Sequence, residues 1–262
     1  MIKSIFKVFN SKRIDMLLLF KRFMGIKYTL FHLKSGEYFK IRNIDKVGIE
    51  VLKNTFELTL ANALLSKLKK GMTVLDIGAN IGYYTVLMAN RVGDSGRVIA
   101  FEPNPVVYDE LKANNELNRF KNVEIMNIAL SNTTGESVFF FPAEGREAHG
   151  SMRSNNTFTS TRIEYVKTDR LDDVLIWCGI NKVDLIKMDV EGAELLVMRG
   201  ANDLLTGKLK PIIFFECAEN QCSSFGFRVF DVLSEIVSFG YFIEQIDFGN
   251  WIAVPKQESS ND

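Results

Sequence analysis

The chain has 262 residues, of which 47% are hydrophobic and 24% are charged, and its formal net charge at pH 7 is zero. This composition is typical of a folded globular protein with one large domain, or with one domain and a small addition. The balanced charge gives no support to a nucleic-acid partner, because binding to phosphates depends on an excess of Lys and Arg.

The first 30 residues are strongly basic, with seven Lys and Arg against Asp15, a net charge of +6 (7 − 1). Apolar residues recur there at helical spacing and are followed by an apolar run at 16–20. The pattern predicts a basic amphipathic helix. Residues 1–24 lie either on an anionic membrane surface, or against the domain or a second subunit of a homo-oligomer. The run is too short to span a membrane, and no secretory cleavage site follows it.

A hairpin and a helix are predicted next. Residues 28–33 and 37–42 are rich in β-branched and aromatic side chains, and they flank a turn at 34–36, which is typical of a β-hairpin. Residues 45–68 carry apolar positions at helical spacing and predict one helix.

A glycine-containing turn follows the first predicted core strand. Residues 74–77 form a short apolar run that suits a buried parallel strand. The turn 78–82 begins and ends with glycine, and helical spacing starts at Tyr83. A strand, a glycine turn and a helix N-terminus together form a place where a ligand can lie against bare backbone.

The next strand, at 97–102, ends in an acid. Glu102 lies 20 positions after Gly82 (102 − 82), the separation typical of a carboxylate that accepts hydrogen bonds from ribose hydroxyls. The spacing Gly78-x-x-x-Gly82 is not the G-x-G-x-x-G of dinucleotide sites, and Asp76 would repel a phosphate and attract a cationic amino group. The sequence therefore predicts S-adenosyl-L-methionine (SAM), with its amino group near Asp76 and its ribose on Glu102.

Further strands alternate with helical segments. Prolines at 103 and 105 begin a predicted helix that extends to about residue 118, and a third core strand is predicted at 123–130. Strands are also predicted at 136–141 and 163–167. The polar stretch between these two strands is too long for a routine connection and is a candidate functional loop. Its His149 is either a general base or a solvent-facing side chain.

Two later strands end in acids. The fourth core strand, at 183–189, ends in Asp189, and the fifth, at 211–216, ends in Glu216. Ligands bind beyond the carboxyl ends of such strands, so both side chains are expected at the cleft. Glu191 is interpreted as a site residue. Glu194 is interpreted as an acid that favours the start of a helix.

The chain ends with a helix predicted at 225–239 and a pair of strands predicted at 241–246 and 250–254. Strands that alternate with helices predict an α/β protein with a doubly wound parallel sheet. The predicted organisation is an N-terminal helix and hairpin cap at 1–70, a main domain at 71–256 and a disordered tail at 257–262.

Three segments resemble the FkbM family of SAM-dependent methyltransferases: 74–85 (VLDIGANIGYYT), 100–105 (AFEPNP) and 186–194 (IKMDVEGAE). The third segment is the most specific, because many class I methyltransferases share the first. The resemblance extends from about residue 33 to about residue 248. It implies a mostly parallel seven-stranded sheet of the class I methyltransferase type. It also implies O-methylation of a sugar, a glycolipid or polysaccharide, or a polyketide-like small molecule.

The resemblance adds the end of the third strand to the site, as the place where the adenine lies. The cofactor site expected from the residues and the resemblance together consists of Asp76, Gly78, Ala79, Asn80, Gly82, Tyr83, Glu102, Pro103, Ala129, Leu130 and Asp189. Asp189 is the first candidate for orienting or deprotonating the acceptor, and the further candidates are Glu191, Glu216 and His149.

Other classes of protein fit the sequence less well or stay open. The glycine spacing and Asp76 disfavour a nicotinamide dehydrogenase, and the sequence after Asp189 lacks the Pro-Pro-aromatic run expected of a nucleic-acid methyltransferase. Asp189, Glu191 and Glu216 could gather around Mg²⁺, so a metal-assisted O-methyltransferase stays open, although no metal ligand is assigned. A non-catalytic SAM-binding or assembly module is the remaining alternative.

Three cysteines, Cys178, Cys217 and Cys222, cannot all pair with one another, and none forms a C-x-x-C motif. This usage indicates buried thiols in a reducing compartment rather than a disulfide framework. The expected localisation is cytoplasmic, with contact to the membrane periphery if the N-terminal helix binds lipid. With two histidines and dispersed cysteines, a zinc site is not expected.

Overall fold

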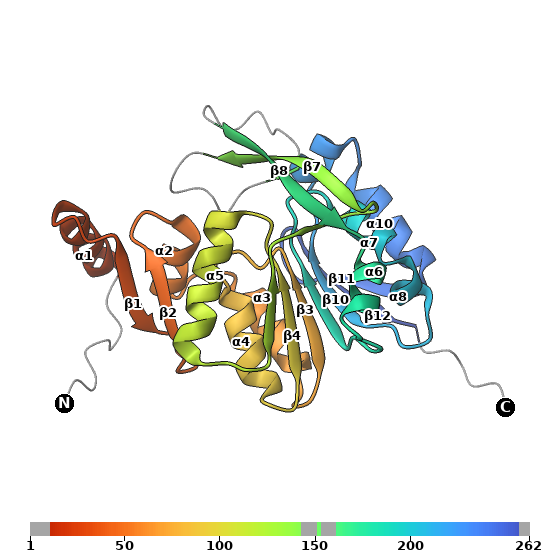
Figure 1. The fold of residues 1–262 in the computed structure, drawn as a ribbon, viewed down its shortest axis with the longest axis horizontal. Coiled ribbons are helices and arrows are strands. Elements are labelled where there is room, and N and C mark those ends of the chain that lie inside the picture. The colour runs from red at the N-terminus through yellow and green to blue at the C-terminus, as the bar shows by residue number, and fades with distance from the viewer. Residues whose placement is uncertain (1–10, 143–150, 153–160, 257–262) are drawn as a thin grey trace.

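The structure, a computed structural model, describes residues 11–142, 151–152 and 161–256 (Figure 1). Within these ranges the main sheet contains β3 (Thr73–Ile77), β4 (Arg97–Phe101), β5 (Val123–Met126), β9 (Leu185–Met188), β10 (Ile212–Glu216), β11 (Tyr241–Gln245) and β12 (Asn250–Pro255). Their spatial order is β11-β12-β10-β9-β3-β4-β5. β12 is antiparallel to both neighbours, and the other neighbouring pairs are parallel. The predicted mostly parallel sheet with a closing antiparallel pair is confirmed.

Helices cover both faces of this sheet (Figure 1). One face carries α3 (Leu58–Lys67), α4 (Tyr83–Val92) and α5 (Pro105–Asn118), and the other carries α6 (Leu171–Trp177), α7 (Glu194–Gly200), α8 (Asn202–Thr206) and α10 (Val229–Ser238). Val74 of β3 packs in one cluster with α3 and α4, whereas the next residue, Leu75, packs with α6, α7 and α10. Because both faces are buried, the strands consist of continuous apolar runs.

A smaller sheet lies beside the carboxyl ends of the main strands. Its described strands are β6 (Ala129–Leu130), β7 (Gly135–Pro142) and β8 (Thr161–Asp169), in the order β6-β8-β7. The strands predicted at 136–141 and 163–167 are confirmed, but the prediction of one strand over 123–130 is wrong. β5 ends at Met126, and β6 pairs with β8 instead. The amide of Asn127 donates to the carbonyl of Glu102 (2.8 Å), so the chain turns away from the main sheet there.

The N-terminal cap is built from α1 (Ser11–Phe23), β1 (Tyr28–His32), β2 (Tyr38–Arg42), α2 (Lys46–Lys53) and α3. The predicted hairpin is confirmed, and its side chains Phe31 and Phe39 pack in one cluster with Val86 of α4. The prediction of one helix over 45–68 is wrong. The chain breaks between α2 and α3, where Asn54 (φ 55°) and Glu57 (φ 39°) adopt left-handed conformations that no helix interior contains.

The C-terminal elements follow the predicted order. The helix predicted at 225–239 begins later, at Val229, after α9 (Glu219–Cys222) and a short 3₁₀ helix (Ser223–Phe225) that ends at Gly226 (φ 79°). Residues 1–10 and the tail predicted at 257–262 lie outside the described residues. None of the described helices has both the length and the apolar content needed to cross a bilayer.

Candidate active site

A pocket opens where the carboxyl ends of β3, β4 and β9 meet the smaller sheet. Its wall is formed by the loops after these three strands and by side chains from β6, β7 and the segment at 151–152. The lining residues are Ile77, Gly78, Asn80, Phe101, Glu102, Pro103, Ile128, Ala129, Leu130, Phe139, Met152, Asp189, Val190 and Glu191. The position matches the rule that ligands of parallel α/β sheets bind beyond the carboxyl ends of the strands.

The turn after β3 brings backbone against backbone. Gly78 has a φ of +75°, and a Cβ placed on it would lie 1.8 Å from the carbonyl oxygen of Asp189. Asn80 also takes a positive φ of 52°, and Gly82 (φ 90°) caps the start of α4. Glycine at 78 is therefore required twice, for its conformation and for its contact with the loop after β9.

Glu102 ends β4 and is fixed by two backbone groups. One carboxylate oxygen accepts a hydrogen bond from the Asn80 N–H and the other from the Asn104 N–H, each at 2.9 Å. Burial raises the pKa of Glu102 to about 7, against the lowering effect of these two hydrogen bonds. Each carboxylate oxygen has two lone pairs, so each can accept one further hydrogen bond from the pocket side.

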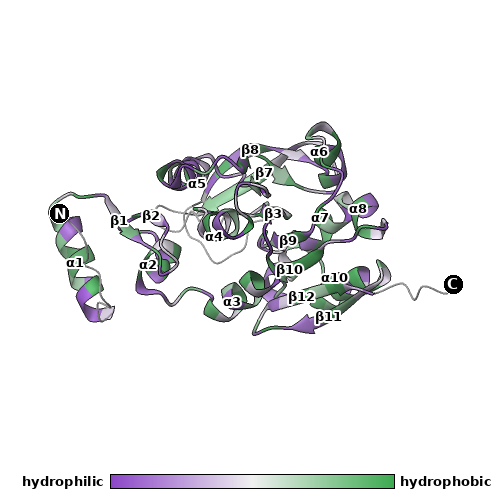
Figure 2. Cartoon of the chain, turned by 90° about the horizontal axis from the view of Figure 1, so that it is seen from below, coloured by the Kyte–Doolittle hydropathy of each residue, from purple (hydrophilic) through white to green (hydrophobic). Residues whose placement is uncertain are grey.

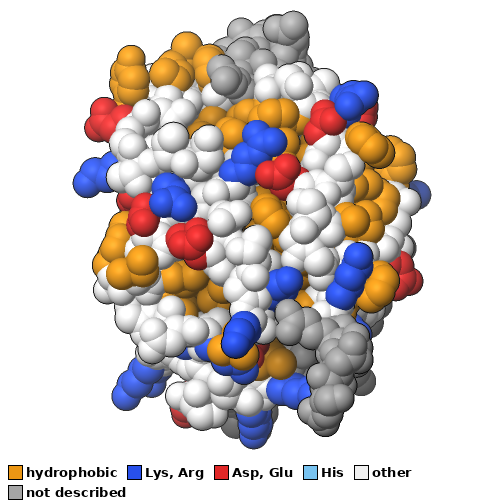
Figure 3. Space-filling view, turned by 90° about the vertical axis from the view of Figure 1, so that its right-hand side faces the viewer, with side chains coloured by type: hydrophobic (Ala, Val, Ile, Leu, Met, Phe, Trp, Pro, Cys, Tyr) orange, Lys and Arg blue, Asp and Glu red, His pale blue; other side chains and the backbone are white. Residues whose placement is uncertain are grey.

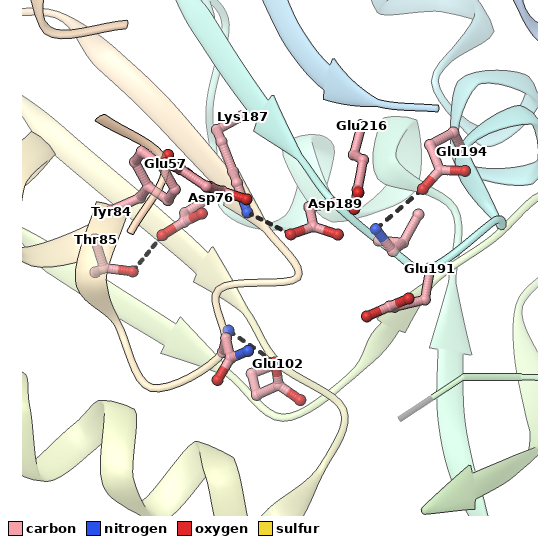
Figure 4. A network of polar contacts seen from close by, with 12 residues as sticks. Glu57, Asp76, Tyr84, Thr85, Glu102, Lys187, Asp189, Glu191, Glu194 and Glu216 are labelled. Atoms are coloured by element: carbon pink, nitrogen blue, oxygen red, sulfur yellow. Dashed lines mark hydrogen bonds and ion pairs between the residues drawn. The ribbon is translucent and has the colours of Figure 1, made fainter. Parts of the chain in front are cut away.

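A buried lysine stands at the centre of a charged cluster beside the pocket (Figure 4). The Lys187 Nζ lies 3.3 Å from Asp189 Oδ2 and 5.0 Å from the ring centroid of Tyr84. Burial disfavours the charge of Lys187, but the nearby Asp189, Asp76 and Glu57 outweigh burial and raise its pKa above the ordinary value. Lys187 therefore stays protonated and holds three acids around it.

Asp76 faces this lysine and not the pocket. It is fully buried on β3, it accepts a hydrogen bond from the Thr85 hydroxyl, and its register partner on β9 is Lys187. Burial raises the pKa of Asp76, and the charge of Lys187 opposes that rise. The sequence predicts that Asp76 attracts the amino group of a ligand. In the structure the cation beside Asp76 is Lys187.

Three acids and an amide meet at the ends of β9 and β10. The Gln221 Nε2 donates to Glu191 (2.9 Å) and to Glu216 (3.2 Å). Burial, together with the charges of Asp189 and Glu191, raises the pKa of Glu216 to about 10. Glu216 therefore carries a proton at neutral pH and can donate a hydrogen bond, but it cannot accept a proton as a base.

Glu194 has a structural position, as predicted from its place at the start of a helix. It is buried and accepts hydrogen bonds from the N–H groups of Val190 (3.1 Å) and Gly192 (3.2 Å), and burial raises its pKa to about 8. These bonds fix the tight loop after β9, in which Glu191 adopts a left-handed conformation (φ 55°).

The structure brings part of the predicted site together. The predicted residues on the pocket wall are Gly78, Asn80, Glu102, Pro103, Ala129, Leu130, Asp189 and Glu191. Ala79, Gly82 and Tyr83 lie in the turn or at the start of α4, off the pocket wall. Asp76 and Glu216 lie beside the pocket without lining it. Tyr83 packs edge-on against Phe56 at 5.4 Å between ring centroids. His149 lies outside the described residues.

Other residues at the site were not predicted as site residues. Glu57 precedes α3 and accepts a hydrogen bond from the Tyr84 hydroxyl (2.7 Å), next to Lys187 and Asp189 (Figure 4). No local pattern in the sequence indicates this position, because Glu57 lies within a segment that has helical spacing. For Lys187 the sequence does contain a signal, because a lysine lies inside an otherwise apolar strand. Phe139 and Met152 complete the wall from the smaller sheet.

Within the described residues, no cluster of three or more His, Cys, Asp or Glu side chains is arranged to hold a metal ion. Of the three acids considered for Mg²⁺, Asp189 forms an ion pair with Lys187. Glu191 and Glu216 accept hydrogen bonds from Gln221.

The strand order, the glycine turn after β3 and the acid that ends β4 define a Rossmann-like fold of the class I methyltransferase type. The family model described as the methyltransferase FkbM domain matches residues 76–243 of this chain. This chain belongs to the FkbM methyltransferase family.

Three curated relatives that match this chain are 28–29% identical to it over the aligned residues. One is methyltransferase sdnD of Sordaria araneosa, 29% identical over 166 residues that cover 53% of this chain and 64% of the relative. Another is hexuronic acid methyltransferase AglP of Haloferax volcanii, 28% identical over 150 residues that cover 57% of this chain and 58% of the relative. A third is 31-O-demethyl-FK506 methyltransferase FkbM of Streptomyces tacrolimicus (28% over 173 residues; 56% and 66%). In each case the chain spans less than two thirds of the relative's length.

Among solved structures, a methyltransferase FkbM from Methylobacillus flagellatus KT is similar over 72% of this chain and 44% of that chain, with 17% sequence identity and a TM-score of 0.48.

Proposed function

We propose that this protein transfers a methyl group from SAM to a hydroxyl oxygen of a small-molecule or glycan acceptor. The observation that carries the proposal is Glu102: a buried carboxylate, fixed by two backbone N–H groups, that faces a pocket next to a glycine turn. A carboxylate held in this way can accept hydrogen bonds from the two hydroxyls of a ribose. The family match at residues 76–243 supports the same reading.

The residues present fit SAM. Glu102 would hold the ribose, the backbone at 78–80 would lie against the cofactor, and Ile128 to Leu130 would contact the adenine. Asp189 and Glu191 are the other two acids on the pocket wall and would meet its cationic groups. When bound, SAM supplies an electrophilic methyl group on a sulfonium, so the protein has to position the acceptor and exclude water.

The acceptor hydroxyl must also lose its proton, and Asp189 is the best-placed group to take it. Its carboxylate lies on the pocket wall, with Lys187 beside it at 3.3 Å. Glu216 carries its own proton at neutral pH because its pKa is raised to about 10, so it serves as a neighbour of Asp189 and not as the base. As the acceptor oxygen gains the methyl group, the proton passes to Asp189 and then to water.

The acceptor class is proposed from the relatives. One acts on a hexuronic acid and another on 31-O-demethyl-FK506, according to their names. We therefore propose a sugar, a glycolipid or polysaccharide, or a polyketide-like molecule with a free hydroxyl. Cys217 and Cys222 are thiols whose sulfur atoms share a hydrogen bond at 3.4 Å, and thiols persist in a reducing compartment, so we propose a cytoplasmic location for the reaction.

Methyl transfer is tested with SAM labelled in its methyl group. The protein is incubated with hexuronic acids, oligosaccharides, glycolipid extracts and hydroxylated macrolides, and label in each product is counted before and after mild alkali. Methyl ethers survive mild alkali and methyl esters do not, so alkali-stable label is expected. SAM binding without transfer to any hydroxyl acceptor would favour a binding module, and the absence of SAM binding would contradict the whole proposal.

The affinity for SAM is expected to depend on pH through Glu102. The ionised carboxylate accepts from both ribose hydroxyls, and the pKa of about 7 in the free protein means that protonation competes with binding below pH 7. The dissociation constant measured by calorimetry should therefore be about tenfold higher at pH 6 than at pH 8, and level above pH 8.

The matched variant is Glu102→Gln, which places an amide NH₂ against one of the two backbone N–H groups. We expect it to bind SAM roughly 30-fold or more weakly, because charge-assisted hydrogen bonds are lost, and to lose the pH dependence. Glu124→Gln, on the outer strand β5, should bind as the wild type does. A Glu102→Gln protein that keeps the affinity or the pH slope of the wild type would contradict the ribose assignment.

A further inference from the structure

Helix α1 is attached to the rest of the protein by one narrow edge. Ile14 and Leu18, one turn apart, are its buried residues, and Asp15 forms an ion pair with Lys53 of α2. Figure 2 shows α1 at one end of the molecule, set apart from the main sheet by the hairpin and α2. Most of the surface of the helix therefore faces solvent.

The outer side of α1 is apolar. At about 100° per residue, positions 16, 19, 20 and 23 form one stripe opposite to the buried pair at 14 and 18. Leu19 is 67% exposed and Phe23 is 87% exposed. The exposed apolar side chains of the stripe and of the turn that follows are Met16, Leu19, Phe20, Phe23, Met24 and Ile26. We name this set the α1 apolar face.

The segment that carries the α1 apolar face is strongly basic. Residues 11–27 contain five Lys and Arg against Asp15, a net charge of +4 (5 − 1), while the whole chain is neutral, so the remainder carries −4. The single acid is directed to Lys53. On the face at the opposite end of the molecule, apolar side chains instead lie among both cations and anions (Figure 3). That face differs from the α1 end, where the helix and the turn that follows carry a net positive charge.

A cavity continues this surface behind the C-terminal end of α1. Its wall includes the cations Arg22, Lys27, Lys40 and Arg42, with the acids Asp109 and Glu110 from α5. Arg42 pairs with Glu110. Ile26 belongs both to the α1 apolar face and to the cavity wall, so the two are continuous. A phosphate-bearing group could enter the cavity while an attached apolar chain lies against the helix.

We propose that α1 and the turn at 24–27 dock the protein on an anionic lipid bilayer, with the α1 apolar face among the upper acyl chains and the surrounding cations on head-group phosphates. A helix that binds a membrane surface in this way has an apolar side and a Lys- and Arg-rich rim, as α1 has. Its 13 residues correspond to about 20 Å, too short to span, so it lies in the plane of the interface.

A second copy of the chain is the other candidate for covering this face, and charge disfavours it. A symmetric dimer would bring two identical surfaces together, each with a net charge of +4 over residues 11–27. Like charges facing each other oppose such an interface, whereas anionic head groups neutralise them.

The test is flotation of the full-length protein with vesicles of phosphatidylcholine alone, or with about 30% phosphatidylglycerol. We expect at least about tenfold stronger binding to the anionic vesicles, and loss of most of that binding in about 0.5 M NaCl. The double variants Phe20→Ser/Phe23→Ser and Arg22→Gln/Lys27→Gln should each bind roughly tenfold or more weakly. Their melting temperatures should match the wild type, because these side chains are exposed.

The controls remove equally exposed side chains elsewhere: Phe230→Ser on α10, at the other end of the molecule, and Lys69→Gln/Lys208→Gln. Both should float as the wild type does. Equal binding to neutral and anionic vesicles, or none, would overturn the proposal. So would a dimer in light scattering that Phe20→Ser/Phe23→Ser converts to a monomer without any vesicle binding. SAM affinity, measured on the same proteins, is expected to stay unchanged, so this inference and the proposed function fail separately.

Discussion

Asp189→Asn is expected to lower kcat by roughly 10²–10⁴-fold, because the variant keeps the size of the side chain but cannot accept a proton from the acceptor hydroxyl. SAM affinity should change by less than about tenfold, because Glu102 and the glycine turn are untouched and Glu191 still faces the cationic groups of SAM. The measurement is single-turnover methyl transfer at saturating SAM, with binding followed separately by calorimetry, so that the chemical step is separated from cofactor uptake.

The matched control is Asp184→Asn, just before the opposite end of the same strand. Asp184 accepts a hydrogen bond from the Thr73 N–H at 2.9 Å, and an asparagine oxygen can accept the same bond. Turnover of Asp184→Asn should therefore equal that of the wild type. Full turnover by Asp189→Asn with SAM bound would show that Asp189 does not take the proton. The base would then be sought among residues that the structure does not describe, among them His149.

Gly78→Ala is expected to lower the free energy of unfolding by roughly 3 kcal/mol or more, or to prevent folding. The added Cβ would lie 1.8 Å from the carbonyl oxygen of Asp189, and the backbone at residue 78 has a φ of +75°. The obstruction is backbone on both sides, so no side-chain rotation can relieve it. Urea denaturation followed by circular dichroism measures the change, with the slope of the transition checked for two-state behaviour.

The variant Gly226→Ala separates the cost of the left-handed conformation from the cost of the backbone clash. Gly226 has nearly the same φ (+79°), but nothing lies within 4 Å of a Cβ placed there. Its substitution should cost only the left-handed conformation, about 1–2 kcal/mol. If Gly78→Ala costs no more than Gly226→Ala, the contact between the loops after β3 and β9 is not as tight as the structure shows it.

The parts of the fold that could be predicted are those set by local pattern. Five parallel strands and the closing pair are predicted by short apolar runs. Each run whose end reaches the pocket is followed by a polar or glycine residue. Glu102 could be placed from its distance to Gly82, because the strand–turn–helix–strand unit has a nearly fixed length. The tips of neighbouring parallel strands meet at one edge, so Asp189 was expected near it.

What could not be predicted depends on contacts between distant segments. The charged cluster requires knowing that Asp76 and Lys187 are register partners on adjacent strands, which no local spacing reveals. Glu57 enters the cluster because the chain leaves helical geometry at positions 54 and 57, inside a run of helical periodicity. The sequence predicts too long a third strand because residues 123–130 stay largely apolar, while the turn away from the main sheet depends on the side chain of Asn127.

Glu57 lies outside the segment that defines the family, which begins at residue 76. Glu102 and the glycine turn thus lie within the matched segment. Glu57, an acid beside Asp189, comes from the residues that precede it. The cluster around Lys187 is therefore assembled from acids on both sides of the point where the family match begins, so a substitution before residue 76 can change the charge beside Asp189.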